Sequence, residues 1–215
     1  MSKNNNINKN IEEENEGNDD DDNTQENFIR DLKTITYVFK NKDKYEGQIL
    51  NNKKHGKGKY IYNTGDYYEG EFYNGKFNGF GKLVYRNGDI YEGDFKEGIK
   101  SGTGKFIFYN ERQYVGDFNN DKASGNGEYN YNSIEKYNGT FKDNKFNGEG
   151  TYTYSNNDKY KGSFENNKKH GLGVIVFKDQ RQFQGKWDND VLAKDYDNFN
   201  LLSVDELSNN NIDKD

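Results

Sequence analysis

The chain has 215 residues with 24 glycines, no proline and no cysteine, and a formal net charge of −6. Only 30% of its residues are hydrophobic, which excludes a thick globular core. The 18 tyrosines and 15 phenylalanines favour a sheet whose apolar surface is aromatic. The absence of cysteine excludes disulfides, thiol nucleophiles and thiolate metal sites, so an intracellular, cytoplasmic location is the default expectation.

The N-terminal region is acidic. Residues 1–30 hold nine acids and three bases, and we expect residues 1–34 to form a disordered tail. They contain no apolar segment of the kind that a signal peptide needs, and no apolar run in the chain is long enough for a transmembrane segment. Residues 35–44, centred on Tyr37-Val38-Phe39, are predicted to form a strand that caps the region that follows.

A strict 23-residue register occupies residues 45–190. Units begin at residues 45, 68, 91, 114, 137, 160 and 183, each with an aromatic residue that is followed two positions later by glycine. Counting that aromatic residue as position one, position five is large and apolar, positions twelve and fourteen are glycine, and positions sixteen and eighteen are again large. Such a register indicates an array of repeats in which each unit contacts only its neighbours. The position-three glycines are Gly47, Gly70, Gly93, Gly116, Gly139, Gly162 and Gly185.

Each unit is predicted to be a β-hairpin. Both of its segments alternate with period two, which places their glycines and rings on one face. Positions seven and eight, such as Asn74-Gly75, carry residue types that tolerate the positive φ of tight reversals. Glycines on the aromatic face leave room for rings from neighbouring strands to lie over the backbone. The expected fold is all-β, an elongated antiparallel sheet of about fourteen strands.

The sequence after the array is again acidic. Residues 191–215 are expected to form a C-terminal tail, in which Ser203 and Glu206 have the spacing of a helix capping box. A short capping helix over residues 203–208 and an irregular tail are the two alternatives. Whether this tail covers the aromatic face of the sheet stays open. We expect no catalytic domain in the 28 residues that follow Trp187.

The segment Tyr68–Gly81 reads Tyr-Glu-Gly-Glu-Phe-Tyr-Asn-Gly-Lys-Phe-Asn-Gly-Phe-Gly and resembles the MORN (membrane occupation and recognition nexus) repeat. The resemblance covers residues 45–189, as six full units and one partial unit. It implies an elongated, twisted antiparallel sheet with an aromatic groove. MORN repeats occur in cytoskeletal scaffolds, in ciliary radial-spoke heads, in proteins that bridge membranes, and beside lipid-kinase and methyltransferase domains.

Two functions from different classes follow. The first is a non-enzymatic scaffold of a cytoskeletal or ciliary (axonemal) assembly that docks protein partners, with self-association into a homodimer left open by the resemblance. The second is a peripheral membrane module that binds acidic phospholipids. We expect no cofactor and no metal, and the sequence pI of about 5.2 disfavours nucleic acid as a partner.

Two surfaces are candidate sites, and each also has a structural interpretation. The predicted groove residues, which are also the material of the core, are Tyr68, Phe72, Tyr91, Phe95, Phe106, Tyr114, Phe118, Tyr129, Tyr137 and Phe141. A stripe of lysines on the hairpin loops either keeps the edge soluble or contacts an anionic surface. These lysines are Lys53, Lys54, Lys76, Lys100, Lys122, Lys145, Lys168 and Lys169.

Other patterns are better explained without a site. His55 and His170 occupy the same repeat position five units apart, too far to act together. Pairs such as Gly56-Lys57-Gly58 lack the further glycine and following helix of a phosphate loop. The acidic groups Asp19–Asp22 and Asp188-Asn189-Asp190 lack the loop of a calcium site and are expected to be solvated.

Overall fold

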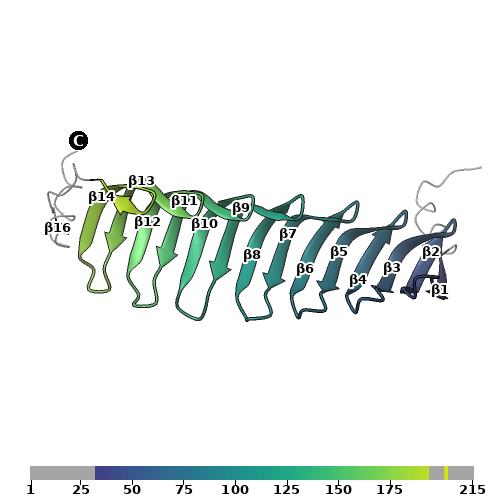
Figure 1. Cartoon of the computed structure of the whole chain (residues 1–215). Coiled ribbons are helices and arrows are strands. Elements are labelled where there is room, and N and C mark those ends of the chain that lie inside the picture. Colours follow the sequence, from purple (N-terminus) through teal and green to yellow (C-terminus); the bar gives the residue numbers. More distant parts are fainter. Residues whose placement is uncertain (1–31, 194–200, 203–215) are drawn as a thin grey trace, which may run out of the picture. The chain divides into compact units, whose positions relative to one another are not determined.

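The computed structural model describes residues 32–193 together with residues 201 and 202, and all regular elements within that part of the chain are β-strands. Fifteen strands lie side by side in one antiparallel sheet in sequence order, and the sixteenth pairs with β14 (Figure 1). The expected all-β sheet of tandem hairpins is confirmed. The strands are β1 (Lys33–Val38), β2 (Lys44–Leu50), β3 (Lys53–Ile61), β4 (Tyr67–Tyr73), β5 (Lys76–Val84), β6 (Ile90–Lys96), β7 (Ile99–Ile107), β8 (Gln113–Asn119), β9 (Lys122–Asn130), β10 (Lys136–Lys142), β11 (Lys145–Thr153), β12 (Lys159–Glu165), β13 (Lys168–Val176), β14 (Gln182–Asp188), β15 (Val191–Leu192) and β16 (Leu201–Leu202).

Each full 23-residue unit forms one hairpin, as the fourth unit shows. Its leading strand β8 has seven residues and its returning strand β9 has nine. Tyr114 pairs with Tyr129, and the glycines at positions three and fourteen pair with each other. These two tyrosines and two glycines therefore all lie on one face of the sheet. The turn between the strands has Asn120 at φ 49° and Asp121 at φ 66°, as a two-residue hairpin turn requires. The predicted turn positions are therefore confirmed.

The tyrosine ring at position one lies over the bare backbone of two glycines. A Cβ added to Gly116 would stand 2.6 Å from the hydroxyl oxygen of Tyr114, and one added to Gly127 on the next strand would stand 2.5 Å from its Cε2. The hydroxyl donates a hydrogen bond of 2.8 Å to the backbone carbonyl of Asp117. The ring can therefore close over the strand pair only because both glycines lack a side chain.

The glycines at position twelve have a different role from the one expected. The pairing of β8 with β9 shifts between Gly116 and Phe118, which indicates a β-bulge on the returning strand. Gly125 in this bulge has φ 103°, and a Cβ added there would meet the carboxylate of Asp117 at 2.6 Å, not a ring. That carboxylate accepts the N–H of Asn126 at 2.8 Å. Position twelve therefore needs glycine for its backbone conformation, and period-two alternation does not continue through the bulge.

Short strands extend the array at both ends. The capping strand expected over residues 35–44 is β1, which begins two residues earlier, within the expected tail of residues 1–34, and ends at Val38; it pairs along its whole length with β2. The predicted C-terminal tail starts as part of the sheet, because β15 pairs with β14 through Trp187 and Leu192. The helix expected over residues 203–208 and the acidic tail up to residue 31 lie outside the described residues.

A matched pair of glycine substitutions tests the assigned face. In Gly116→Ala the new Cβ would lie 2.5 Å from the backbone atoms Asn126 O and Gly127 Cα, whereas in Gly75→Ala it would have no atom within 4 Å. Gly75 has φ 90°, so its substitution carries only a backbone strain of about 1–3 kcal/mol. We expect Gly116→Ala to destabilise the chain by about 1–3 kcal/mol more, because of overpacking. Equal losses in urea unfolding would contradict the placement of Gly116 under the ring.

Candidate functional site

An edge-to-face ladder of aromatic rings runs along one face of the sheet. The ring centroid of Phe118 at position five lies 5.1 Å from Tyr114 of its own unit and 4.9 Å from Tyr91 of the preceding unit. Equivalent contacts recur from Tyr45 to Trp187. Such pairs each contribute about 0.5–1.5 kcal/mol beyond the burial of their area. The ladder therefore joins every unit to the next.

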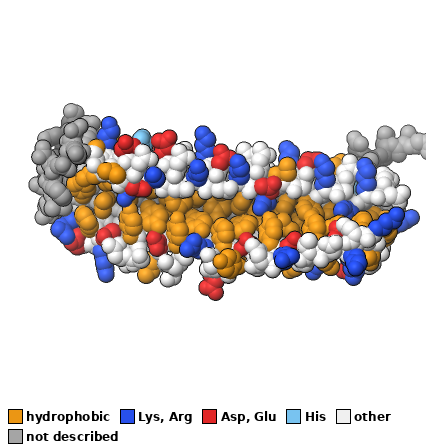
Figure 2. Space-filling model, viewed as in Figure 1, with side chains coloured by type: hydrophobic (Ala, Val, Ile, Leu, Met, Phe, Trp, Pro, Cys, Tyr) orange, Lys and Arg blue, Asp and Glu red, His pale blue; other side chains and the backbone are white. Residues whose placement is uncertain are grey.

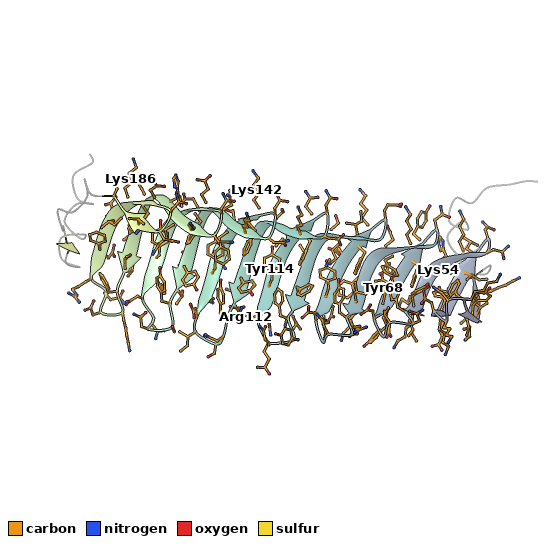
Figure 3. All side chains as sticks on the ribbon, viewed as in Figure 1. Lys54, Tyr68, Arg112, Tyr114, Lys142 and Lys186 are labelled. Carbon is orange, nitrogen blue, oxygen red and sulfur yellow. The ribbon has the colours of Figure 1, made fainter. Side chains whose placement is uncertain are left out.

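The ten predicted groove residues all contribute to this face, and most of them are core residues. Phe106 and Tyr129, both at position sixteen, are half-buried against the core. Figure 2 shows a continuous band of hydrophobic side chains between two rows of charged ones, and Figure 3 shows Tyr68 and Tyr114 on the same face of the ribbon. The exposed part of the band is therefore formed by the outer rings, not by the ladder. The eight residues that are exposed by 7% or less are Tyr68, Phe72, Tyr91, Phe95, Tyr114, Phe118, Tyr137 and Phe141.

The residue at position ten, above the ladder, is of three kinds among the six full units. This position pairs with position five and so shares its face. Phe77 stacks on Tyr68 with 3.7 Å between ring centroids, and Phe146 stacks on Tyr137 at 3.8 Å. In the fourth unit the residue is Ala123. The remaining full units have lysine there: Lys54, Lys100 and Lys169.

The eight loop lysines do not form one stripe, which corrects the sequence prediction. Lys54 and Lys100 lie over rings instead, with the Nζ of Lys54 4.2 Å from the ring centroid of Tyr60 and that of Lys100 5.2 Å from Phe106. Burial lowers the pKa of both ammonium groups, and the nearby carboxylates of Asp43 and Asp121 partly offset this. Lys169 occupies the same position over Tyr160, at 5.7 Å. The reason is that a returning strand begins at position nine, so positions nine and ten point to opposite faces.

Five of the predicted lysines remain on the edge of the sheet that carries the hairpin turns. Two of them are paired: Lys76 Nζ lies 2.7 Å from Glu97 Oε2, and Lys122 Nζ lies 2.9 Å from Asp143 Oδ1. Exposed pairs of this kind are worth little in stability but reduce the net positive charge of the edge. The exposed edge lysines at position nine are Lys53, Lys76, Lys122, Lys145 and Lys168.

Carboxylates on the opposite edge connect successive units, a role that the sequence analysis missed. Asp66 accepts the backbone N–H of Arg86 at 2.7 Å, and Asp89 accepts that of Tyr109 at 2.8 Å. The N–H of Arg86 is the main cause that lowers the pKa of Asp66. The signal in the sequence is an acid that recurs near the end of a unit, but its partner is a backbone group and leaves no pattern. These acids are accounted for by the fold.

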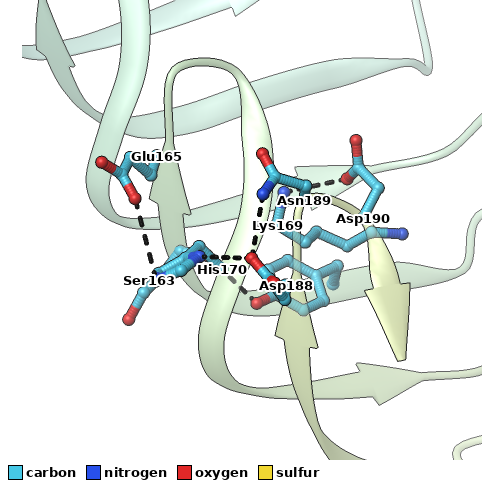
Figure 4. Close-up of polar contacts among 8 residues, drawn as sticks. Ser163, Glu165, Lys169, His170, Asp188, Asn189 and Asp190 are labelled. Carbon is cyan, nitrogen blue, oxygen red and sulfur yellow. Dashed lines mark hydrogen bonds and ion pairs between the residues drawn. The ribbon is translucent and has the colours of Figure 1, made fainter. Parts of the chain in front are cut away.

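The two histidines lie on different strands and in different surroundings. His55 in β3 packs against Tyr73, and His170 in β13 lies between two carboxylates, 3.7 Å from Glu165 and 3.5 Å from Asp188 (Figure 4). In the same region Asp190 accepts the N–H of Lys169 at 2.8 Å and so holds the turn. Within the described residues, no three histidine, aspartate or glutamate side chains are grouped so that they could hold a metal ion.

A single sheet of tandem hairpins with a shared ladder of rings defines a β-hairpin repeat protein. The model of the MORN repeat matches the chain at residues 45–67, 68–90, 91–111, 114–133, 137–159 and 160–180, which together exceed half its length. The chain therefore belongs to the MORN repeat family, and the resemblance seen in the sequence is confirmed.

No curated protein matches the chain significantly. Among solved structures, it is similar to the TCP domain of SAS-4 (dCPAP) of Drosophila melanogaster, determined in complex with a proline-rich motif of Ana2 (dSTIL). That match has a TM-score of 0.42 and 11% identity, and it covers 71% of this chain and 77% of the other. In the described part of the chain, no helix has the length and apolar character needed to cross a membrane.

The buried tyrosines predict a loss of stability at high pH. Burial raises the pKa of Tyr45 to about 12 from its ordinary 10.0, and it also raises the pKa of Tyr91 and Tyr114. An unfolded chain ionises these phenols near their ordinary value, so stability is complete below that pH and is lost as the pH rises above about 10. Denaturant midpoints measured from pH 8 to 12 should therefore fall steeply above pH 10.

Tyr114→Phe is the control for this prediction. It removes the hydrogen bond to Asp117 and should cost about 1 kcal/mol at neutral pH. It should also reduce the number of protons released on unfolding above pH 10 by about one, so that the free energy of unfolding falls less steeply with pH. An unchanged slope would show that Tyr114 does not contribute to the pH dependence.

Proposed function

We propose that the chain is a non-enzymatic scaffold that docks protein partners along its aromatic face in a cytoplasmic assembly, of the cytoskeleton or of a cilium or flagellum. Membership of the MORN family supports an interaction role in general, because MORN repeats are typical of protein-interaction or membrane-binding modules. The observation that carries the proposal is the hydrophobic band in Figure 2, whose outer rings stay half-exposed along successive units. A long apolar band between charged rows is typical of an interaction surface.

The outer rings at position eighteen are the best place to test docking. Tyr154 is half-buried and packs on Tyr152 with 4.9 Å between centroids, outside the ladder itself. Its neighbour Ser155 is exposed. A carboxylate at position 154 would place a charge in the band, whereas one at position 155 would lie in solvent.

We expect the purified full chain to cosediment saturably with detergent-extracted cytoskeletons of ciliated cells. Tyr154→Glu should weaken this binding by roughly tenfold or more, as the loss of a buried aromatic anchor does, and Ser155→Glu should leave it unchanged. Melting curves of both variants check that the sheet is intact. Absence of cosedimentation of the wild-type chain, or equal binding of both variants, would contradict the proposal.

The second candidate is a peripheral membrane module. It is favoured by the recurrence of exposed lysine at position nine on one edge, at Lys53, Lys145 and Lys168. Adjacent hairpins lie about 10 Å apart, close to a Debye length, so each lysine would act nearly independently and contribute about 1 kcal/mol at an anionic surface. This edge carries less free positive charge than the sequence alone indicated, because three of the predicted lysines lie over rings and two on the edge are paired with carboxylates.

Charge reversal distinguishes this edge from general electrostatics. We expect the triple variant Lys53→Glu, Lys145→Glu and Lys168→Glu to lose binding to vesicles that contain phosphatidylserine and a phosphoinositide. The matched control reverses three exposed lysines in loops of the opposite edge: Lys40, Lys42 and Lys178. Vesicle sedimentation with equal losses in both triples, or binding that does not fall with added salt, would reject the lysine edge as a lipid site.

A further inference from the structure

The fourth unit leaves a gap in the cover of the ladder. Position ten faces the groove in every unit, and in two units it is a phenylalanine that stacks on the tyrosine of the same hairpin. Ala123 has only a methyl group at this place, opposite Phe118 in the pairing of β8 and β9. The chain itself therefore shows which kind of side chain fits over a position-one tyrosine and where one is missing.

A hollow of about 390 Å³ lies at this position. Its apolar lining includes Tyr114, Phe118 and Ala123, together with Phe106 and Tyr129. Figure 3 shows Tyr114 near the middle of the aromatic face. An apolar cavity of about 150 Å³ is large enough to bind benzene, so this hollow has ample room for an aromatic side chain.

One rim of the hollow carries Lys100 and Asp121, which lie near each other but form no ion pair within 4 Å in the part of the chain that the structure describes. Lys100 Nζ donates to the hydroxyl of Tyr85 at 3.2 Å. The other polar groups at the rim hold the backbone: Asp121 accepts the N–H of Lys100 at 2.9 Å, and Asn144 accepts the N–H of Ala123 at 2.8 Å. Because Asp121 is held by the backbone N–H of Lys100, the ammonium group of Lys100 is the charged donor left for an occupant, and an occupant with a carboxylate on the Lys100 side of its ring complements it.

The chain's own aromatic residues outside the described range are too far away to fill the hollow. Phe28 precedes residue 32 by four residues, a reach of about 14 Å, whereas β9 is eight strands from β1, or about 38 Å. Tyr196 follows Ala193 by three residues, a reach of about 10 Å, and Phe199 lies two residues before Leu201, which pairs with β14. Strand β14 is five strands or about 24 Å from β9. An aromatic side chain in the hollow must therefore come from another chain.

We propose that the hollow over Ala123 receives an aromatic side chain of a protein partner, with an acidic residue of the same segment paired to Lys100. The proposal rests on the proposed docking function and specifies it: the anchoring point is the full unit whose position ten has neither a ring nor a lysine side chain over the ladder. A phenylalanine or tyrosine in this place would repeat the stacking that Phe77 and Phe146 make within the chain.

A displayed library of random twelve-residue peptides, selected on the immobilised full chain, tests this. We expect the selected peptides to share an aromatic residue with an aspartate or glutamate within two positions. A synthetic copy of the best peptide should bind Ala123→Phe roughly tenfold or more weakly, because the new ring occupies the hollow. Ala123→Ser, which leaves the space open, is the matched control and should retain binding.

The filled variant should remain folded. Phenylalanine is the residue that two other units have at this position, so the melting temperature of Ala123→Phe should not fall below that of the wild type. If that variant fails to fold, Ala123→Lys provides the same test, because lysine occupies position ten in three units. Lys100→Glu should weaken the same peptide by repelling its carboxylate.

The outcomes separate this inference from the proposed function. A peptide that loses binding to Tyr154→Glu but binds Ala123→Phe normally would leave groove docking intact and overturn the hollow as its anchor. Selection of peptides without aromatic residues, or of none, would also overturn it. A homodimer that dissociates in Ala123→Phe, seen by sedimentation velocity, would replace the protein partner with a second copy of this chain.

Discussion

The structure depends on one arrangement: a tyrosine ring that lies over two glycines and touches the rings of the next unit edge to face. Tyr114 shows all of its parts, because its ring covers Gly116 and Gly127, its hydroxyl donates to the carbonyl of Asp117, and its ring meets Phe118. Each ring is shared between neighbouring hairpins, so no hairpin has a complete core of its own. The spacing within each strand is therefore fixed, since an insertion between the tyrosine and its glycine on the same strand would turn the glycine to the other face.

This ladder also explains why the surface above it can vary. Position ten is Phe77, Lys100 and Ala123 in three successive units, yet the tyrosines beneath these residues are all buried. Because the ladder carries the stability, the layer above it is free to differ from unit to unit. A regular sheet can therefore present an irregular face, and this difference between units gives a partner a defined place to dock.

The sequence was sufficient to predict the hairpins, the turns and the aromatic face, because each depends on residue types that recur at a fixed spacing. It was not sufficient to place Lys54 and Lys100. Each closely follows turn residues and is predicted to lie in a loop, but a strand already begins at the residue before it. It also misread Gly125, because a bulge interrupts alternation without changing the repeat length. The carboxylate of Asp66 escaped notice because its partner is a backbone N–H, a group that every residue except proline has.

The last described hairpin carries an aliphatic side chain at position ten. This residue is Leu192, which lies over Gly185: a Cβ added to that glycine would be 2.6 Å from the Cδ1 of Leu192. Between β1 and this end, each unit meets only its neighbours through the same ring contacts. Genes that encode such arrays can gain or lose whole units by recombination between repeats. The distance between two attached partners would then change in steps of one hairpin, while the short strands β1 and β15 would still cover the two ends.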